Sequence, residues 1–481
     1  MEQTMLKRKM YLAGEWVFRD KTIDVENPQN GEIIAQVPAA SREDAIFAIK
    51  EGIKGAEIAR NMPTYERISI LNKVANWIED RQSLFAKTIA TEGSKTIREA
   101  KKEVLRCIQT IRISAEEARR LHGETILFDQ LAGNENRVGY YQRFPIGLIV
   151  AITPFNDPLN LVAHKIGPAI AAGNSIIVKP STLTPLSALL LAEAFHEAGL
   201  PKKVLTVITG HSSDIGDELV THPAVRMISF TGGYEAGKSI SSKAGIKKLS
   251  MELGSNSPCI VLRDADIPDA VESIVSGAFW AAGQNCLGVQ RVYIEEEIYS
   301  TVERLLVDRT KQMRVGDKLN EMTDMGPLIT EKEAIRIEKL VQQSLREGAK
   351  LLCGGRRNGA YYEPTILTNV HPESKIAKEE IFGPVVILDS IRDLNEAIQK
   401  SNNVMYGLQA GIFTKNLDFA FRAIKEMEFG GIMVNDSSDF RIDSMPFGGM
   451  KQSGIGREGV AFAIQEMTEQ KVVCFKIGSN F

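Results

Sequence analysis

The sequence predicts an α/β protein in which a doubly wound parallel sheet is followed by a second α/β unit and accompanied by a small β arm. Apolar segments of strand length alternate with segments of helical spacing between residues 146 and 262, and a second alternation runs from about 268 to 430. Such alternation is typical of parallel sheets whose strands are joined by helices. The chain of 481 residues is also long enough for two or three domains.

The N-terminal part is predicted as short strands and turns over residues 10–40, followed by helices. A helix start is expected at Ser41, because Glu43 and Asp44 follow it and apolar residues then recur at helical spacing. The two longer helical segments predicted in this part are 64–92 and 96–121.

The first alternating region defines the doubly wound sheet. Its predicted strands are 146–153, 175–180, 204–209, 227–231, 247–253 and 259–262. The helices expected between them are 158–171, 184–198, 212–221 and 235–244. In the second region, the expected helices are 268–282, 297–313, 331–347, 393–402 and 416–428, and the expected strands include 291–294, 385–389 and 410–413.

Two more strands are predicted outside these regions. Residues 137–144 alternate in character and lie between the helical block and the first apolar strand, and residues 471–477 suit pairing at a sheet edge. An excursion of this kind can form a hairpin that leaves the domain to contact a partner subunit.

Composition excludes several classes of protein. A net charge of −3 gives no electrostatic case for binding nucleic acid or an anionic membrane, and no apolar run reaches the roughly 18 residues of a transmembrane helix. The basic N-terminus is not followed by the apolar stretch of a signal peptide. The scattered, odd set of cysteines argues against a disulfide framework and a zinc site, so we expect no metal and a reducing cytoplasm; these cysteines are 107, 259, 286, 353 and 474.

One of these cysteines lies in a glycine-rich turn. Cys286 is preceded by Gly283 and followed by Gly288 in the segment 279–292. Glycines let the backbone turn tightly and leave N–H groups open toward a ligand. A thiol in such a turn can attack a carbonyl carbon while a neighbouring N–H stabilises the oxyanion. The alternative is a small buried side chain, which is the usual role of a free cysteine.

Polar residues follow several of the predicted parallel strands. Ligands bind beyond the carboxyl ends of such strands, where the sequence places Asn156, Lys179, Gly210, Thr231 and Glu252. A loop at 379–385 adds Glu380 and Phe382. Taken one at a time, Asn156 could be a turn residue, Glu252 a paired surface charge and Phe382 part of the core.

Residues 454–459 match the G-x-G-x-x-G dinucleotide fingerprint letter for letter. The match follows a predicted loop, and no βαβ unit comes after it. Because the fingerprint has meaning only between a strand and a helix, we expect it to be a chance match.

Together with the segment PFGGMKQSGIGRE (446–458), these pieces resemble the aldehyde dehydrogenase superfamily over about residues 10–475. Residues 159–174 and 434–449 are most similar to the lactaldehyde and phosphonoacetaldehyde dehydrogenase branch. The resemblance implies an aldehyde dehydrogenase-like fold. It also implies that the protein assembles as a homodimer or homotetramer. Its parts would be an NAD(P)-binding domain (1–122 and 145–252), a catalytic domain carrying the cysteine (253–445) and oligomerisation strands (123–144 and 465–481).

The same resemblance implies a chemistry. Cys286 would attack the aldehyde, and its backbone N–H and the side chain of Asn156 would stabilise the oxyanion. After hydride transfer to the nicotinamide, Glu252 would activate the water that hydrolyses the thioester.

The resemblance also implies a cofactor site, with Lys179 at the adenosine ribose, Glu380 at the nicotinamide ribose and residues 230–237 at the pyrophosphate. Two positions depart from the family pattern, since Gly233 replaces a serine and Ser255 a glycine. No acidic residue adjoins Lys179 in the sequence to select a free ribose hydroxyl. The expected cofactor is therefore either NAD or NADP. The full candidate set is Ile152, Thr153, Pro154, Phe155, Lys179, Thr182, Gly210, Phe230, Thr231, Gly232, Gly233, Leu253, Glu380 and Phe382.

The substrate is expected to be a short aldehyde that is hydroxylated or anionic. Asp157 stands where the family usually has an aromatic residue, and polar residues follow on the same helical face. A polar wall disfavours binding of a long alkyl chain, because the polar groups of the wall would be left without hydrogen-bond partners. The candidates for contact are Asp157, Asn160, His164, Arg441, Phe447 and, more remotely, Arg106.

Four alternatives remain open at this point. Arg441 could instead pair with Asp439 or Asp443 on the surface, and Arg106 could belong to a solvated face with Arg98. CoA could accept the acyl group in place of water, although a water-activating Glu252 would then have little purpose. A non-catalytic binding protein on this fold is the alternative of another class.

Overall fold

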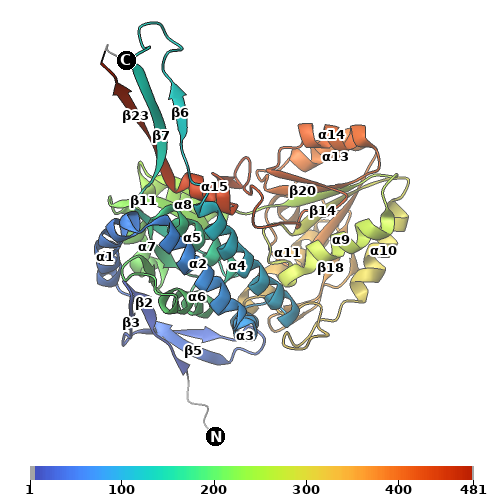
Figure 1. Cartoon of the computed structure of the whole chain (residues 1–481). Coiled ribbons are helices and arrows are strands. Elements are labelled where there is room, and N and C mark those ends of the chain that lie inside the picture. The colour runs from blue at the N-terminus through green and yellow to red at the C-terminus, as the bar shows by residue number, and fades with distance from the viewer. Residues whose placement is uncertain (1–5, 479–481) are drawn as a thin grey trace.

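The computed structural model describes residues 6–478, which form two α/β bodies side by side and a β arm that projects from the first (Figure 1). Residues 1–5 of the expected NAD(P)-binding segment and 479–481 of the expected C-terminal oligomerisation segment lie outside the described residues.

The first body is built around an eight-stranded sheet in the order β22-β12-β11-β8-β9-β10-β2-β3. Strands β12, β11, β8, β9 and β10 run parallel, as predicted. Strand order reverses between β8 and β11, and ligands bind at such a reversal, beyond the carboxyl ends of the strands. The bounds are β2 (Met10–Leu12), β3 (Glu15–Val17), β8 (Leu148–Ile152), β9 (Ser175–Lys179), β10 (Leu205–Val207), β11 (Val225–Thr231), β12 (Lys248–Glu252) and β22 (Gly454–Ile455).

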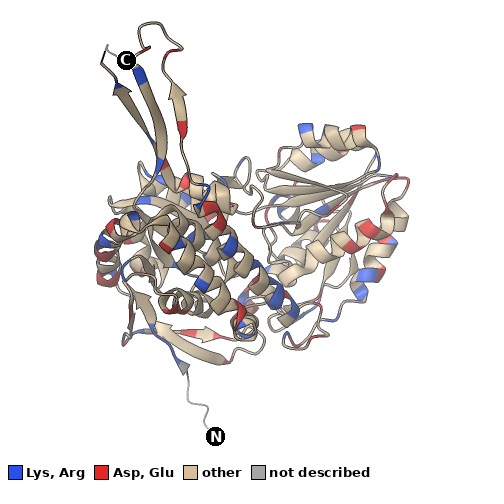
Figure 2. Ribbon diagram, in the orientation of Figure 1, with Lys and Arg blue, Asp and Glu red and all other residues tan. Residues whose placement is uncertain are grey.

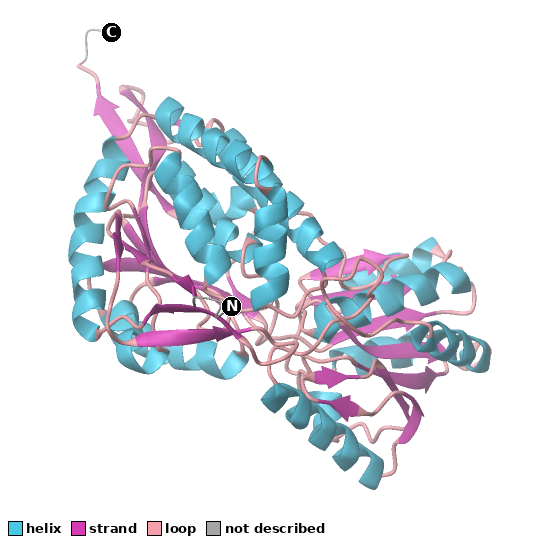
Figure 3. Ribbon diagram, turned by 90° about the horizontal axis from the view of Figure 1, so that it is seen from below, coloured by secondary structure: helices cyan, strands magenta, loops and turns pink. Residues whose placement is uncertain are grey.

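Helices cover both faces of this sheet (Figure 3). Strands β8 and β9 are therefore buried almost throughout, which explains why they are continuous apolar runs and do not alternate. Helix α5 is buried along its whole length between the sheet and α4. The helices are α1 (Arg42–Asn61), α2 (Thr64–Glu79), α3 (Gln82–Glu92), α4 (Ile97–Ala118), α5 (Asn160–Ala172), α6 (Leu186–Glu197), α7 (Ser212–Thr221), α8 (Tyr234–Ala244) and α15 (Val460–Glu466).

The second body contains a seven-stranded sheet in the order β15-β18-β19-β14-β13-β20-β21, parallel except for β15. Separate apolar clusters lie on its two faces, one under α9 to α11 and one under α13 and α14. The strands are β13 (Ser257–Val261), β14 (Val289–Glu295), β15 (Lys350–Cys353), β18 (Thr365–Thr368), β19 (Val385–Ile391), β20 (Gln409–Phe413) and β21 (Gly431–Val434). The helices are α9 (Ile267–Phe279), α10 (Tyr299–Lys311), α11 (Glu331–Arg346), α12 (Lys375–Lys378), α13 (Leu394–Asn402) and α14 (Leu417–Glu426).

The arm is a three-stranded antiparallel sheet in the order β23-β7-β6 that extends away from the first body (Figure 1). It joins β6 (Glu124–Leu127), β7 (Arg137–Pro145) and β23 (Thr468–Lys476). The predicted hairpin and the predicted C-terminal strand therefore pair with each other. Smaller sheets are formed by β1 (Leu6–Lys7), β4 (Thr22–Glu26) and β5 (Ile33–Pro38), and by β16 (Arg357–Asn358) with β17 (Tyr361–Tyr362).

Three local predictions need comment. The helix expected over 64–92 is two helices, because α2 ends at Glu79 and α3 begins at Gln82. The helix expected over 268–282 ends at Phe279 and continues as a distorted 3₁₀ turn. The fingerprint match at 454–459 contains the short β22, which pairs antiparallel with β12, so the prediction that it is not a dinucleotide-binding βαβ unit is confirmed.

Basic and acidic residues are interspersed over both bodies (Figure 2), in line with the small net charge. Within residues 6–478, none of the helices has the length and apolar character needed to cross a membrane.

Candidate active site

The connection between the two sheets brings the candidate base and nucleophile together. Strand β12 ends at Glu252 and β13 begins at Ser257, so the carboxyl edge of the first sheet faces the amino edge of the second. Strand β14 lies beside β13 with Val289 opposite Ser257, and Cys286 comes directly before it. Topology therefore places Cys286 and Glu252 at the same junction.

The turn before Cys286 has an unusual backbone. Ala281, Ala282 and Gly283 all have positive φ angles, of 49°, 56° and 70°. The buried Glu99 of α4 accepts a hydrogen bond from the Ala281 N–H at 2.8 Å, and Gln284 donates to the Ala281 carbonyl at 2.9 Å. A left-handed conformation at alanine costs free energy and persists only where the surroundings fix it, which is common at functional sites.

A second strained turn packs against the first. A Cβ atom on Gly283 would lie 2.2 Å from the carbonyl oxygen of Gly383, so only glycine fits there. The neighbouring Phe382 also has a positive φ angle, of 49°, and its ring meets that of Phe155 edge to face at 5.8 Å. Phe382 and Phe155 thus join the loops that follow β8 and precede β19.

Cys286 is partly exposed and packs against Leu287, Leu408 and Phe447. Burial raises the pKa of the Cys286 thiol to about 12, and the charge of Arg441 opposes this rise. In the described part of the chain, neither the backbone N–H of Cys286 nor the side chain of Asn156 donates a hydrogen bond. Both donors are free to bind an oxyanion formed at the sulfur.

Glu252 is a buried carboxyl group without a partner. Only 2% of the residue is exposed, and neither carboxyl oxygen accepts a hydrogen bond from any group of residues 6–478. Burial, helped by the nearby Glu458, raises its pKa well above the ordinary value. The alternative that Glu252 is a paired surface charge is wrong, and its environment suits a general base that acts on a bound water.

Two residues that the sequence reading missed complete this region. Lys165 of α5 and Glu458 form a buried ion pair, and Arg441 donates to Glu458 at 3.2 Å. Burial alone raises the pKa of Glu458, but Lys165, Arg441 and His164 together hold it at about 2. The available signal was a lysine in the middle of an otherwise apolar helix, since a lysine is almost never fully buried unless it is paired.

The cofactor candidates line the carboxyl edge of the first sheet, around the reversal of strand order. Lys179 is buried, and burial lowers its pKa to about 8; its Nζ has only a 3.5 Å contact with the Pro180 carbonyl. Gly233 is the N-cap of α8 and supplies no side-chain cap. A lone buried cation and an uncapped helix N-terminus both suit the ribose hydroxyls and phosphates of a dinucleotide.

The remaining cofactor candidates lie along the same edge. Thr153 follows β8, and Gly232 follows β11 and donates to the Glu252 carbonyl at 3.0 Å. The other candidates at this edge are Ile152, Pro154, Phe155, Thr182, Gly210, Phe230, Thr231 and Leu253.

Glu380 reaches the junction from the loop before β19. It accepts a hydrogen bond from the Ser255 N–H at 2.8 Å, and burial raises its pKa to about 7. A Cβ on Gly254 would lie 2.5 Å from a Glu380 oxygen. The hydroxyl of Ser255, which replaces the family's glycine, is 2.9 Å from that of Ser257.

The polar substrate candidates form one network. Asp157 is paired with the buried Lys95 and lies 3.5 Å from Arg106, which also donates to Asp443 at 2.7 Å. The prediction that Arg106 belongs to a freely solvated face is therefore wrong. The Arg106 guanidinium, which was expected to contact substrate, is already engaged by these two carboxylates.

Asp443 holds two further candidates in place. It accepts hydrogen bonds from the Asn160 amide at 3.1 Å and from His164 Nε2 at 2.8 Å. Asn160 is completely buried, and its amide oxygen accepts a hydrogen bond from Thr110 at 2.8 Å. Protein groups bind Asn160 on both sides, so it connects α5 to α4 and does not face a substrate.

Arg441 is buried and does not form either of the surface pairs considered from the sequence. Its guanidinium stacks on Phe447 at 3.7 Å and donates to Glu458, while its Nε has no partner. Phe447 belongs to the apolar cluster against which Cys286 packs, and the charge of Arg441 lowers the pKa of Cys286, so Arg441 lies near the nucleophile.

A family model described as the aldehyde dehydrogenase family matches residues 16–473. The chain belongs to this family. A 3-sulfolactaldehyde dehydrogenase from Priestia aryabhattai is 44% identical over 471 residues, covering 97% of this chain and 98% of that protein. A lactaldehyde dehydrogenase from Methanococcus maripaludis is 42% identical over 468 residues, covering 96% and 99%, which confirms the predicted resemblance to that branch.

Solved structures agree with this assignment. Aldehyde dehydrogenase 21 from Physcomitrella patens, in complex with the reaction product succinate, is 40% identical with a TM-score of 0.97, over 99% of this chain and all of that one. Other structures of this fold, 37–40% identical, are complexed with NADP. The protein is an NAD(P)-dependent aldehyde dehydrogenase with the predicted α/β fold.

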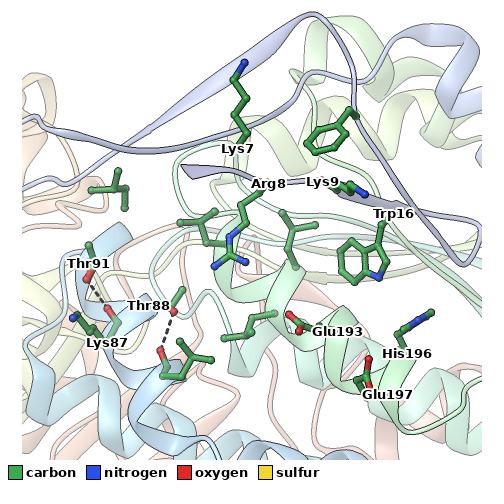
Figure 4. Close-up of a pocket in the computed structure, with 16 residues that line it drawn as sticks. Lys7, Arg8, Lys9, Trp16, Lys87, Thr88, Thr91, Glu193, His196 and Glu197 are labelled. Atoms are coloured by element: carbon green, nitrogen blue, oxygen red, sulfur yellow. Dashed lines mark hydrogen bonds between the residues drawn. The ribbon is translucent and has the colours of Figure 1, made fainter. Parts of the chain in front are cut away.

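A surface hollow of about 720 Å³ lies elsewhere in this aldehyde dehydrogenase, between the N-terminal strands and helices α3 and α6 (Figure 4). The hydroxyls of Thr88 and Thr91 that line it donate to carbonyls of their own helix. Its cations, among them Lys7, Arg8 and Lys87, are exposed to solvent. The hollow is separate from the site around Cys286.

The raised pKa of Cys286 makes its alkylation depend on pH. The thiolate is the reactive form, so labelling of the Cys286 peptide by iodoacetamide should speed up about tenfold per pH unit between pH 7 and 9. Arg441→Ala removes a charge that lowers this pKa, and labelling at a given pH should then be slower. Peptide mass spectrometry measures both rates, with the exposed Cys474 as internal reference and Arg422→Ala as the matched control. A rate that stays flat over this pH range contradicts the assignment.

Proposed function

We propose that this enzyme oxidises a short polar aldehyde, hydroxylated or anionic, to its carboxylic acid through a thioester on Cys286 that water hydrolyses. The observation that carries the proposal is the buried, unpartnered carboxyl group of Glu252 at the same junction as a thiol held in a strained turn. Desolvated groups of this kind are characteristic of catalytic sites.

In the first step, the Cys286 thiol gives up its proton to solvent and the sulfur attacks the aldehyde carbon. The oxygen takes up negative charge, which the Cys286 N–H and the Asn156 amide can stabilise without reorganisation because neither is engaged elsewhere in the described chain. The carbon then loses hydride, and the carbonyl reforms as a thioester. The nicotinamide supplies the hydride acceptor when it is bound, and Lys179 and Glu380 are the residues that we propose hold its two riboses.

In the second step, Glu252 removes a proton from water as the water attacks the thioester carbon, and the carboxylic acid leaves as Cys286 is regenerated. A raised pKa strengthens Glu252 as a base, and the nearby Lys165, Arg441 and Arg457 favour its charged form. These opposing effects allow Glu252 to accept a proton and lose it again in each cycle.

The same observation weighs against transfer of the acyl group to CoA. A thiol such as CoA needs no water-activating base, whereas burying Glu252 without a partner costs free energy that a role in hydrolysis explains.

The preference for a polar substrate rests on Arg441, which stacks on Phe447 beside the apolar cluster that Cys286 packs against. Arg441 is buried with its Nε unused, and a buried unpaired donor disfavours an alkyl chain. Two relatives are named for 3-sulfolactaldehyde and lactaldehyde, and a solved structure of this fold holds succinate. All three of these compounds are short and carry a hydroxyl or an anionic group.

We also propose that the arm joins copies of this chain into a homodimer or homotetramer. Large apolar side chains lie exposed on its strands, among them Leu127, Val138, Val472 and Phe475. A thin sheet with exposed apolar residues and two open edges favours association with another subunit.

Replacing Glu252 should separate hydride transfer from hydrolysis. Glu252→Gln keeps the shape of the side chain but removes the base, so a stopped-flow trace should show about one NAD(P)H per active site followed by a very slow steady state. The trapped thioester should appear by mass spectrometry on the Cys286 peptide. Cys286→Ala is the control and should give no burst. A Glu252→Gln enzyme that turns over normally without CoA would rule out Glu252 as the base.

Removing Arg441 should discriminate between substrates. Arg441→Ala should reduce kcat/KM for succinic semialdehyde. The loss should correspond to about 1.5–3 kcal/mol of transition-state stabilisation, as expected for a hydrogen bond to a charged group. The kcat/KM for pentanal, a neutral aldehyde of similar size, should fall much less. Arg422→Ala removes an exposed arginine of α14 and should change neither value. Equal losses on both aldehydes, or a wild-type preference for hexanal over every short polar aldehyde, contradict the substrate assignment.

Charged residues on the arm should weaken assembly. Val472→Lys with Phe475→Lys places two like charges on the outer strand β23, and sedimentation velocity should then detect smaller species than for the unmodified protein. Tyr65→Lys is the control, because Tyr65 is also exposed but lies on α2 of the first body. An unchanged sedimentation coefficient for the arm variant would show that subunits associate through another surface.

A further inference from the structure

The bend that carries Asn156 is held in place by its neighbours. Asn156 is partly exposed, and its side chain forms no hydrogen bond within residues 6–478. On one side of it, the ring of Phe155 meets Phe382 edge to face at 5.8 Å, and Phe382 lines a small recess together with Cys286. The bend therefore lies beside the turn that holds the nucleophile.

On the other side of Asn156, a buried cation holds Asp157. The carboxylate of Asp157 forms an ion pair with Lys95, of which only 3% is exposed, and lies 3.5 Å from the more exposed guanidinium of Arg106. An ammonium group has three donors to satisfy, and a buried one has little access to solvent. Moving Asp157 away from Lys95 therefore costs free energy.

Lys95 is in turn held by Glu103 of α4. One carboxylate oxygen of Glu103 accepts a hydrogen bond from Lys95 Nζ at 2.8 Å. The other oxygen accepts from the backbone N–H groups of Leu159 and Asn160, at 2.8 and 3.0 Å. Helix α5 has no capping side chain of its own, so Glu103 caps its first turn. Lys95 thus ties the bend to α4 and to the start of α5.

This anchor reaches Asn156 through a single peptide bond. The backbone of Asn156 is fixed by the residues before and after it, while its amide stays free to donate. An oxyanion donor is effective only when it already lies within hydrogen-bond distance of the position that the oxyanion will occupy. A displacement of about 1 Å can reduce the rate by about 10²-fold. The position of Asp157 therefore bears directly on the reaction.

We propose that the ion pair of Lys95 with Asp157 positions Asn156 to donate to the oxyanion formed at Cys286. The proposal rests on the proposed function and deepens it, because it names the residues that set the geometry of one oxyanion donor. Lys95 and Asp157 are positioning residues that act on the reaction through Asn156. In this role, Asp157 does not need to contact the substrate.

Two substitutions of Asp157 test the anchor. Asp157→Ala releases the bend but leaves the pair of Lys95 with Glu103 in place. Asp157→Asn keeps an oxygen that can accept a hydrogen bond from the Lys95 ammonium group. Replacing Lys95 itself is less informative, because two buried carboxylates would lose their cation and the protein could fail to fold.

Glu51→Ala is the matched control. Glu51 is also a largely buried carboxylate with two basic partners, Lys54 and Lys203. It lies at the opposite edge of the first sheet from the active site, since the carbonyl of the adjacent Gly52 accepts a hydrogen bond from Ser175, the first residue of β9.

The measurement is a double-mutant cycle on kcat/KM for lactaldehyde and for propanal. Asn156→Ala should lower both values by about 10²–10³-fold, and Asp157→Ala should lower both by about tenfold. In the Asn156→Ala background, Asp157→Ala should cost less than about twofold, because the group that it positions is gone. Every aldehyde forms the same oxyanion, so the two substrates should respond alike. Asp157→Asn should recover part of the loss, and Glu51→Ala should change neither value.

The inference is overturned if Asp157→Ala stays within about twofold of the unmodified enzyme, or if its loss is equally large in the Asn156→Ala background. A loss for lactaldehyde alone also overturns it, because Asp157 would then contact the substrate. An equal loss in Glu51→Ala does so too, since any buried carboxylate would then have the same effect.

Should Asp157→Ala fail to fold, Asp157→Asn takes its place in the cycle. Its loss of about threefold should then vanish in the Asn156→Ala background, and either no loss or a loss that persists there overturns the inference. Failure of the proposed function is a different result, because Asn156→Ala would then keep most of its kcat/KM whatever residue stands at position 157.

Discussion

The short connection between the two sheets is the constraint on which the active site depends. Residues 253–256 alone link the carboxyl end of β12 to the amino end of β13, so the edges of the two sheets must meet. Parallel strands bind ligands beyond their carboxyl ends, and the cofactor edge of the first sheet consequently faces the loops that precede β14 and β19. The thiol and Glu380 come from loops of the second body, whereas Glu252 and Lys179 are the last residues of β12 and β9 in the first.

Basic side chains at this junction are grouped around two buried carboxylates. Lys165 and Arg441 share Glu458, while Arg106 and His164 share Asp443. Buried ion pairs contribute little net stability, but removing one partner costs about 3–5 kcal/mol because a charge is left uncompensated. We therefore interpret these pairs as a device that fixes the orientation of the side chains around the substrate.

Much of this arrangement could be predicted from sequence, since its signals are local. Cys286 lies in a glycine-rich turn, Asn156 lies past a strand end and Glu252 at one, so residue type and position made them candidates, and the resemblance to the family implied their roles. The alternation of strands and helices is also a local signal, and it predicted the parallel sheet.

The partners of the charged residues could not be predicted in this way. Asp443 meets Arg106 across 337 positions of sequence, and Glu458 meets Lys165 across 293. Which charges pair over such separations depends on how α4, α5 and the loop before β22 pack. For this reason the sequence favoured a solvated face for Arg106 and left a surface pair open for Arg441, and neither Lys165 nor Glu458 was recognised.

Glu99 has a consequence for the dynamics of the enzyme. One of its carboxyl oxygens completes the N-terminal cap of α4, and the other binds the Ala281 N–H in the turn before Cys286. Local opening reactions in proteins involve contiguous cooperative units that lose their hydrogen bonds together. If the first turn of α4 frays, the strained turn loses its anchor in the same event, and the nucleophile loses its position. The two bodies are thus coupled in their fluctuations as well as in their average structure.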